Sequence, residues 1–175
     1  PGEAWAAAVE VAAETHVRYL PAPVPRVLSL VAPRYADLWT GAKGFYKVEP
    51  AVADGGEVVL YAPHITQIAA MHPEQQGLGY HCRDWFLAHW DEYKGHPRGE
   101  LAHSTHLYGA GSYDPVHGER QRVRVTLATG IPEDVVRRAN LGYLDPASVD
   151  VDRWTADPGA LVVPDAGEVL YRVRR

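Results

Sequence analysis

The sequence predicts an α/β fold: a three-layer sandwich in which helices cover a mostly parallel central sheet of about four to five strands. Two short runs, residues 26–31 and 57–62, are apolar along their whole length. Such runs are typical of strands that are covered on both faces, as in a parallel sheet. Helical and strand patterns alternate along the rest of the chain, which is the order expected of an α/β sandwich.

The first predicted element is a helix over residues 4–19. It is rich in alanine, a strong helix former. Its larger side chains and some of its alanines recur at close to 3.6 residues, the helical period, namely Trp5, Val9, Ala12, Ala13 and His16. Three prolines follow within six residues and end the helix, because proline cannot donate the backbone hydrogen bond that a helix requires.

A strand at residues 26–31 comes next, and residues 39–44 form a corner loop after it. We expect a short helix over residues 47–54, and the second buried strand begins at residue 57. One or two helical turns are expected in residues 65–71. Together these segments predict a β-loop-α-β unit.

The second half of the chain contains two further helices, over residues 83–93 and 132–140. The second of these has proline at its first position, acidic residues in its first turn and arginines in its last, which suits the helix dipole. Residues 109–120 are rich in turn-forming residues and predict a polar loop. Strands are expected at residues 122–128 and 160–163, the latter followed by a turn into a last extended segment.

Composition limits the class of protein. The chain has 175 residues, 46% of them hydrophobic, which fits a single α/β domain spanning residues 1–175. Its net charge of −5 predicts no nucleic-acid partner, since such proteins carry basic stripes. No apolar run approaches the roughly 20 residues that span a bilayer, and none resembles a signal peptide. The single cysteine, Cys82, rules out an internal disulfide and fits a cytoplasmic location.

Lys43 and Lys47 are the leading candidate binding residues. They lie one helical turn apart, after a predicted strand, at the position where anionic ligands bind in open α/β sheets. A lysine at the start of a helix faces an already positive helix terminus, which is better tolerated if an anion binds there. Gly41 and Gly44 on either side of Lys43 allow the backbone to approach a ligand closely.

Histidines provide a second set of candidates. His103 and His106 are three residues apart and can share one helix face, where they could contact a ligand or bind a metal. No third metal ligand is fixed by the spacing. His64 directly follows the strand at residues 57–62, so it is expected near the same edge of the sheet as Lys43. A metal-dependent hydrolase that uses His103 and His106 therefore stays open as an alternative.

Two segments carry a resemblance to a known family. They are DLWTGAKGFYKVEPAVADGGEVVLYAPHI, residues 37–65, and RVTLATGIPEDVVRRANLGYLDP, residues 124–146. Both resemble the carboxyl-terminal half of the nickel-dependent lactate racemase family, whose members racemise or epimerise 2-hydroxy acids with a nickel-pincer nucleotide. The resemblance implies two α/β domains with the active site between them. It also implies that the cofactor and the catalytic histidines belong to an amino-terminal domain.

The resemblance assigns a role to Lys43, which matches the family lysine that binds the substrate carboxylate. Thr40 stands where the family often has glutamine, and Trp39 stands where it has tyrosine. These departures favour a hydroxy acid or polyol acid larger than lactate. The chain itself is then expected to hold no catalytic residue, no metal and no cofactor.

The resemblance also sets the expected partners, which are a small anionic hydroxy acid and the amino-terminal domain of the same enzyme. The chain begins at Pro1 without an initiator methionine, and we expect it to be a piece of a longer protein that is inactive alone. A stand-alone ligand-binding or interaction module is the alternative from a different class. An exposed apolar surface, ready to receive another domain, would argue against that alternative.

Overall fold

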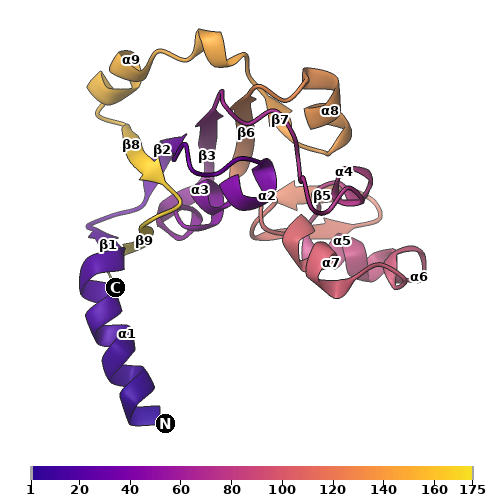
Figure 1. Ribbon diagram of the computed structural model, residues 1–175, viewed down its shortest axis with the longest axis horizontal. Coiled ribbons are helices and arrows are strands. Elements are labelled where there is room, and N and C mark those ends of the chain that lie inside the picture. Colours follow the sequence, from indigo (N-terminus) through magenta and orange to yellow (C-terminus); the bar gives the residue numbers. More distant parts are fainter. Residues whose placement is uncertain (1, 175) are drawn as a thin grey trace.

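The computed structural model describes residues 2–174 and confirms the predicted fold class. Its central sheet has five strands in the order β7-β6-β3-β2-β8, and all four neighbouring pairs are parallel. The strands are β2 (Val24–Val31), β3 (Val52–Ala62), β6 (Arg124–Thr129), β7 (Gly142–Tyr143) and β8 (Ala160–Ala166). Helices flank this sheet, as a three-layer sandwich requires (Figure 1).

Short helices make up most of the rest of the molecule. The α-helices are α1 (Gly2–His16), α2 (Leu38–Gly41), α3 (Lys43–Tyr46), α4 (Gln75–Leu78), α5 (Arg83–Ala88), α6 (Trp90–Tyr93), α7 (Arg98–Ser104), α8 (Glu133–Arg138) and α9 (Val151–Ala156). Two 3-10 turns are η1 (Glu49–Ala51) and η2 (Pro146–Ser148). Two small sheets pair β1 (Val17–Leu20) with β9 (Leu170–Val173), and β4 (Gly111–Asp114) with β5 (Gly118–Gln121).

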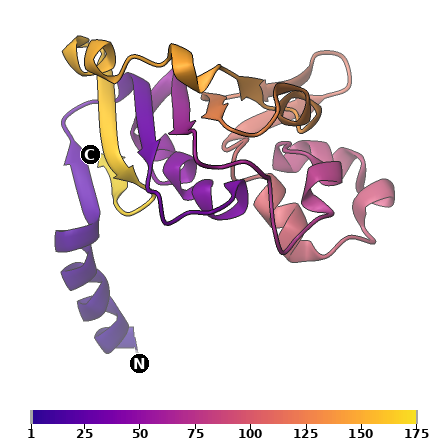
Figure 2. The same ribbon diagram turned by 45° about the horizontal axis from the view of Figure 1, so that its top comes forward.

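Alternating side chains of the central strands build two separate cores. In β2, Val27 joins the larger core, and Leu28 joins a smaller one on the opposite face. Neighbouring residues of a strand point to opposite faces, so a strand buried on both faces must be apolar throughout. The segment after β7, which includes Trp154 of α9, covers the smaller core. In Figure 2 this segment arches over the sheet.

Helix α3 lies directly against the larger core. Phe45 is fully buried there. Gly44 allows the close approach, because a Cβ atom at this position would lie 2.8 Å from Leu60 Cδ2. The hydroxyl of Ser29 on β2 donates a 2.6 Å hydrogen bond to the Gly44 carbonyl oxygen. These contacts fix the position of α3 and therefore of its first residue, Lys43.

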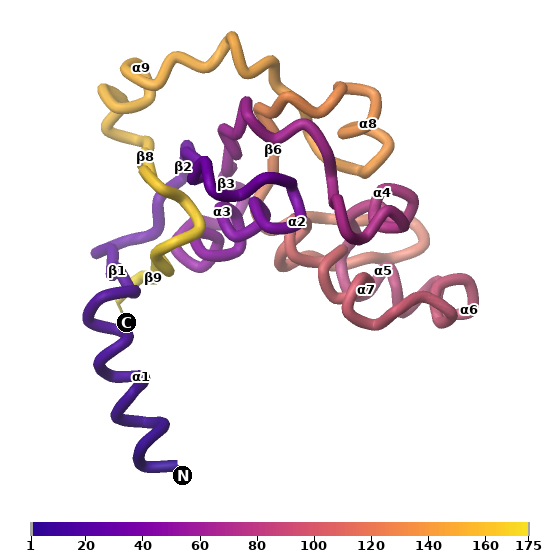
Figure 3. Tube along the Cα trace, in the orientation of Figure 1, coloured from indigo at the N-terminus to yellow at the C-terminus, as the bar shows by residue number. Residues whose placement is uncertain are grey.

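A small lobe extends from one side of the sheet. Helices α4 to α7 and the β4–β5 hairpin form it, and the tube in Figure 3 shows it set apart from the strands. Leu78, Phe86 and Leu101 make a separate apolar cluster inside it. The lobe places residues 72–122 beside α2. Histidines that are far from Trp39 in the sequence therefore contact it in the folded chain.

Helix α1 projects from the body of the molecule in both Figure 1 and Figure 2. None of its residues is buried, and Trp5 is 70% exposed. The following strand β1 pairs in parallel with β9, from Val17 opposite Leu170 to Leu20 opposite Val173. Within residues 2–174, no helix has both the length and the apolar character needed to cross a membrane.

Several predicted boundaries were wrong. The first helix ends at His16 instead of residue 19, because residues 17–20 pair with β9. The expected corner loop at 39–44 is largely helical, in α2 and α3. The expected helix at 47–54 is instead a turn, the 3-10 turn η1 and the start of β3. Lys47 therefore ends α3 and does not open a new helix.

The second half of the chain required similar corrections. The expected polar loop at 109–120 contains the antiparallel β4–β5 hairpin. The single helix expected at 83–93 is interrupted at His89, which separates α5 from α6. Residues 65–71 form no helix. In each case the local sequence pattern was weak, and contacts between distant segments determine the structure.

Candidate functional site

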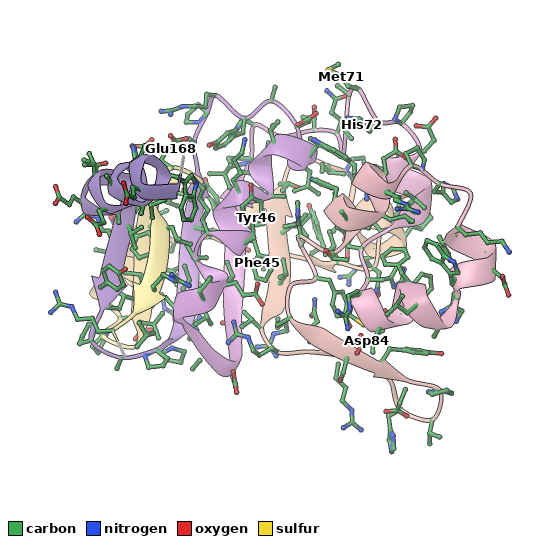
Figure 4. The ribbon with its side chains drawn as sticks, turned by 90° about the horizontal axis from the view of Figure 1, so that it is seen from below. Phe45, Tyr46, Met71, His72, Asp84 and Glu168 are labelled. Atoms are coloured by element: carbon green, nitrogen blue, oxygen red, sulfur yellow. The ribbon has the colours of Figure 1, made fainter. Side chains whose placement is uncertain are left out.

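The candidate site lies at the carboxyl edge of the central sheet. Arg34 and Tyr35 follow the end of β2, and Glu168 follows the end of its neighbour β8. Because the strands are parallel, both ends meet at the same edge, which is the usual ligand position in such sheets. In Figure 4, Glu168 and His72 lie toward one edge of the molecule, and Tyr46 of α3 lies between them in this view.

Glu168 is the centre of one group of polar contacts. The Tyr35 hydroxyl donates a 2.5 Å hydrogen bond to Glu168 Oε1, and Arg34 Nη1 lies 3.0 Å from Oε2. The hydrogen bond from Tyr35, assisted by the charges of Arg34, Lys47 and Lys43, lowers the pKa of Glu168. Burial, together with the carboxylate of Glu168, raises the pKa of Tyr35 to about 12. At neutral pH the phenol is therefore a donor and the carboxylate is charged.

The two candidate lysines approach this group from α3. Lys47 Nζ donates a 3.1 Å hydrogen bond to the backbone carbonyl of Glu168. Lys43 Nζ lies 5.0 Å from the centre of the Tyr35 ring, within the range of a cation–π contact. Among residues 2–174, no carboxylate lies within 4.0 Å of the Lys43 ammonium. Lys43 is thus held in place through its stem and the ring, and its charge stays available to an anion.

Gly167 is needed for this packing. Its φ angle is +105°, a region that side chains disfavour. A Cβ atom there would lie 2.6 Å from the ring of Tyr35 and 3.1 Å from Lys43 Cβ. The absence of a side chain lets the turn after β8 close onto Tyr35 and Lys43.

Trp39 lies between two histidines. Its ring stacks on His103 with centroids 3.7 Å apart and on His72 with centroids 4.0 Å apart. His103 Nε2 also lies 2.9 Å from the Trp39 carbonyl oxygen, so this nitrogen carries the proton and donates. His72 Nδ1 is 3.3 Å from Glu100 Oε1. The indole therefore packs between the side chains of His72 and His103.

The two predicted histidines differ in environment. His103 is buried, and burial lowers its pKa to about 4 because the imidazolium loses hydration. The hydrogen bond with Trp39 acts in the opposite direction without offsetting this effect. His106 is exposed and its ring lies 5.0 Å from that of Tyr46 and 5.2 Å from that of His103. His106 is therefore the histidine of this pair that an external ligand can reach.

Thr40 makes only local contacts. Its hydroxyl donates a 2.7 Å hydrogen bond to Asp37, whose carboxylate also accepts from the backbone N–H groups of Thr40 and Ala70. Burial would raise the pKa of Asp37, but these hydrogen bonds outweigh it and the pKa is lowered. The threonine completes the amino-terminal cap of α2 and so supports the position of Trp39.

His64 lies in a different hollow from Lys43. This hollow of about 390 Å³ is at the carboxyl ends of β2, β3 and β8, and Leu30 and Tyr61 are among its lining residues. Both of these side chains belong to the face of the sheet that packs under α9. Lys43 does not line the hollow, and α3 packs on the opposite face. The sheet thus separates His64 from the lysine group.

The predicted histidine pair does not form a metal site with its neighbours. Within residues 2–174, no group of three or more His, Cys, Asp or Glu side chains could hold a metal ion. The ring nitrogen Nε2 of His103 already donates to a carbonyl. The pair His103 and His106 therefore has no third ligand in this part of the chain.

Four residues near the candidates were not singled out from the sequence: Arg34, Tyr35, His72 and Glu168. Arg34 and Tyr35 stand just beyond the end of a predicted strand, the same signal that drew attention to His64. Glu168 lies more than 120 residues after Lys47 in the chain, and no local pattern connects the two. His72 meets Trp39 only through the small lobe.

Comparisons with known proteins agree on the fold. No family model matches the chain, and no curated protein matches it by sequence. A crystal structure of a Thermotoga maritima protein is similar over 98% of this chain and 42% of that one, with 32% identity and a TM-score of 0.89. The lactate racemase apoprotein from Thermoanaerobacterium thermosaccharolyticum is similar over 93% of this chain and 39% of that one, with 13% identity and a TM-score of 0.61.

Both of these solved proteins are longer than the matched region. The chain spans about two fifths of the length of each. At 13% identity, the likeness to the lactate racemase apoprotein concerns the arrangement of strands and helices. The chain therefore shares its fold with a part of that protein.

Proposed function

We propose that this chain is the substrate-binding domain of a racemase or epimerase of 2-hydroxy acids, and that Lys43 binds the substrate carboxylate. One observation carries the proposal: the Lys43 ammonium is fixed beside Tyr35 at the carboxyl edge of the sheet, with no carboxylate of residues 2–174 within 4.0 Å. Lysine binds carboxylates as a compact point charge with three donors. The shared fold with a lactate racemase apoprotein supports the same assignment.

The surroundings of Lys43 include further candidate contacts. Trp39, Thr40, Lys47, His64, His103 and His106 are the other residues that the sequence proposed. Of these, His106 offers an accessible imidazole close to Tyr46 of α3, whereas the Trp39 indole is already stacked on His72 and His103. Lys47 contributes charge but already donates to a backbone carbonyl. His64 is the least favoured, since it lines another hollow.

The proposed partner is an amino-terminal domain that completes the active site. The exposed helix α1 supports this proposal, because a helix of 15 residues is marginal in water without tertiary packing. Trp5, Val9 and Val11 on it are 70%, 45% and 65% exposed. An exposed tryptophan on a projecting helix argues against a stand-alone binding module, because it provides an apolar surface for another domain.

A nickel-pincer nucleotide is the cofactor that the proposal implies, and the family resemblance places it in the amino-terminal domain. Among residues 2–174, no three or more His, Cys, Asp or Glu side chains are grouped so that they could hold a metal ion by themselves. We therefore assign the cofactor and the chemical steps to the partner domain. The role of this chain is to bind and orient the anionic end of the substrate.

A titration of the chain with small acids tests the proposal. An isotope-labelled sample is followed by NMR while D-lactate, L-lactate and propionate are added at constant ionic strength. A racemase domain must accept both enantiomers, so we expect similar affinities for D- and L-lactate, with shifts at Lys43. Removing the cation in Lys43→Ala should weaken binding about fivefold or more, as for loss of a charged contact.

Lys94→Ala is the matched control. Lys94 is exposed at the end of α6 and pairs with Asp91, so its removal should leave lactate binding unchanged. If both substitutions weaken lactate binding equally, or if neither weakens it, Lys43 is not a carboxylate site. Stoichiometric Zn²⁺ or Ni²⁺ bound through His103 and His106 would instead favour the hydrolase alternative.

A further inference from the structure

We infer that Arg34 is a second anion-binding residue of this site, and that the site takes a hydroxy acid with a second carboxylate, such as a hydroxy-dicarboxylate. This inference rests on the proposed function and makes its substrate class narrower. It starts from two neighbouring parallel strands, β2 and β8, whose ends bring Arg34 and Glu168 together.

The charges of the site are unbalanced. Three cationic side chains, Arg34, Lys43 and Lys47, surround one carboxylate, that of Glu168, and all three lower its pKa. Two positive charges therefore remain. A monocarboxylate would leave one of them without a counter-charge, whereas a dicarboxylate balances both.

The carboxylate of Glu168 already lies where Arg34 and Tyr35 could bind a substrate carboxylate. Its two oxygens have different partners: Oε1 accepts a hydrogen bond from the Tyr35 hydroxyl, and Oε2 forms an ion pair with Arg34. A substrate carboxylate can accept from the same two donors. The side chains of Arg34 and Glu168 are 61% and 37% exposed, so both can be reached from solvent. Exposed ion pairs of this kind are weak, and an incoming carboxylate can therefore replace Glu168 at Arg34.

The two cations contact different groups of the Tyr35–Glu168 pair. Lys43 Nζ is 5.0 Å from the centre of the Tyr35 ring, and Arg34 Nη1 is 3.0 Å from the far oxygen of Glu168. Two carboxylates joined by a short carbon chain offer each of these cations its own counter-charge, with the hydroxyl carbon between them.

The test compares malate with lactate on the full 175-residue chain by NMR titration at constant ionic strength. We expect malate to bind about fivefold more tightly, the effect of one additional exposed charge contact. Arg34→Gln should abolish this preference, so that the ratio of the malate affinity to the lactate affinity falls to about one. Glu168→Gln, which removes the internal competitor but keeps a hydrogen-bond acceptor for Tyr35, should strengthen malate binding.

Arg83→Gln is the matched control, because Arg83 also forms an exposed ion pair, with Asp84, and should not alter the ratio. The inference would be overturned if the ratio of malate affinity to lactate affinity stayed the same in Arg34→Gln, or if Arg83→Gln reduced this ratio equally. Either outcome would leave the proposed role of Lys43 standing. Lactate and malate binding that both survive Lys43→Ala would instead overturn the proposed function. Binding of succinate as tight as that of malate would also overturn the hydroxy-acid assignment.

Discussion

The imidazole of His103 lies almost parallel to the indole of Trp39, with ring centroids 3.7 Å apart and an angle of 7° between the planes. The contact joins α7 of the small lobe to α2 at the edge of the central sheet. His103 is 5% exposed, and its neutral form fits this apolar position better than its cation. The stack therefore ties the position of Trp39 to the charge state of one histidine.

The first prediction concerns pH. The pKa of His103 is lowered from 6.5 to about 4 in the folded chain. Between these values the unfolded chain binds a proton that the folded chain does not, so stability falls as the pH drops from 6.5 toward 4. The loss is on the order of 3 kcal/mol at most. Urea denaturation across this range measures it.

His103→Gln removes this titration, and its stability should depend less on pH than that of the unchanged chain over the same window. His64→Gln is the control, because His64 is exposed and lines a hollow that His103 does not line, so its substitution should leave most of the slope in place. Identical slopes for His103→Gln and the unchanged chain would contradict the assignment.

A second prediction tests the turn after β8. Gly167→Ala should destabilise the chain by about 3 kcal/mol, from backbone strain and overlap with the ring of Tyr35. Gly118 is the control, since its φ is also positive, +73°, but a Cβ atom added there would meet no other atom within 4 Å. Gly118→Ala should cost only about 1 to 2 kcal/mol. Equal losses, measured by chemical denaturation, would show that the contact with Tyr35 does not matter.

A third prediction concerns α3. Phe45 is fully buried, whereas Leu87 on α5 is 58% exposed. Phe45→Ala should cost about 3 to 5 kcal/mol, because it leaves a cavity beneath the lysine-bearing helix. Leu87→Ala should change stability by no more than about 0.5 kcal/mol. Thermal and urea unfolding distinguish the two, and a small effect at Phe45 would mean that α3 is not packed as described.

A fourth prediction concerns α1. Deleting residues 1–16 should leave the free energy of unfolding within about 0.5 kcal/mol of its original value, because no residue of α1 is buried. Deleting residues 1–20 also removes the four residues of β1 that pair with β9. This longer deletion should cost more than about 1 kcal/mol through lost apolar contact. A large loss from the shorter deletion alone would show that α1 packs on the body of the chain.

The sequence was sufficient for the central sheet and insufficient for its surroundings. Strands near residues 26–31 and 57–62 are apolar because both faces are buried, and this leaves a clear local signal. Helices α2 and α3 have four residues each, too few to show a helical period. The strands of the β4–β5 hairpin are mostly polar and contain no buried residue, so their sequence resembles that of a loop.

The same holds for the candidate site: features formed by neighbouring residues could be predicted from the sequence, and contacts between distant segments could not. Lys43 could be identified because the strand, the glycines and the lysine are adjacent in sequence. Arg34 and Glu168 meet only because β8 pairs with β2, and no local pattern specifies that pairing. His64 was expected near Lys43, but which face of the sheet a loop residue reaches depends on the path of the loop after the strand. Hydrophobic periods and turn residues do not encode that path.

The parallel pairing of β1 with β9 determines what lies beside the end of α1. Val17, the first residue after α1, is opposite Leu170, and Glu168 precedes Leu170 by two residues. In a parallel pair both strands begin at the same end, so α1 and the turn that carries Glu168 enter this small sheet side by side. A partner that contacts the end of α1 would therefore lie next to the carboxylate that pairs with Arg34 and Tyr35.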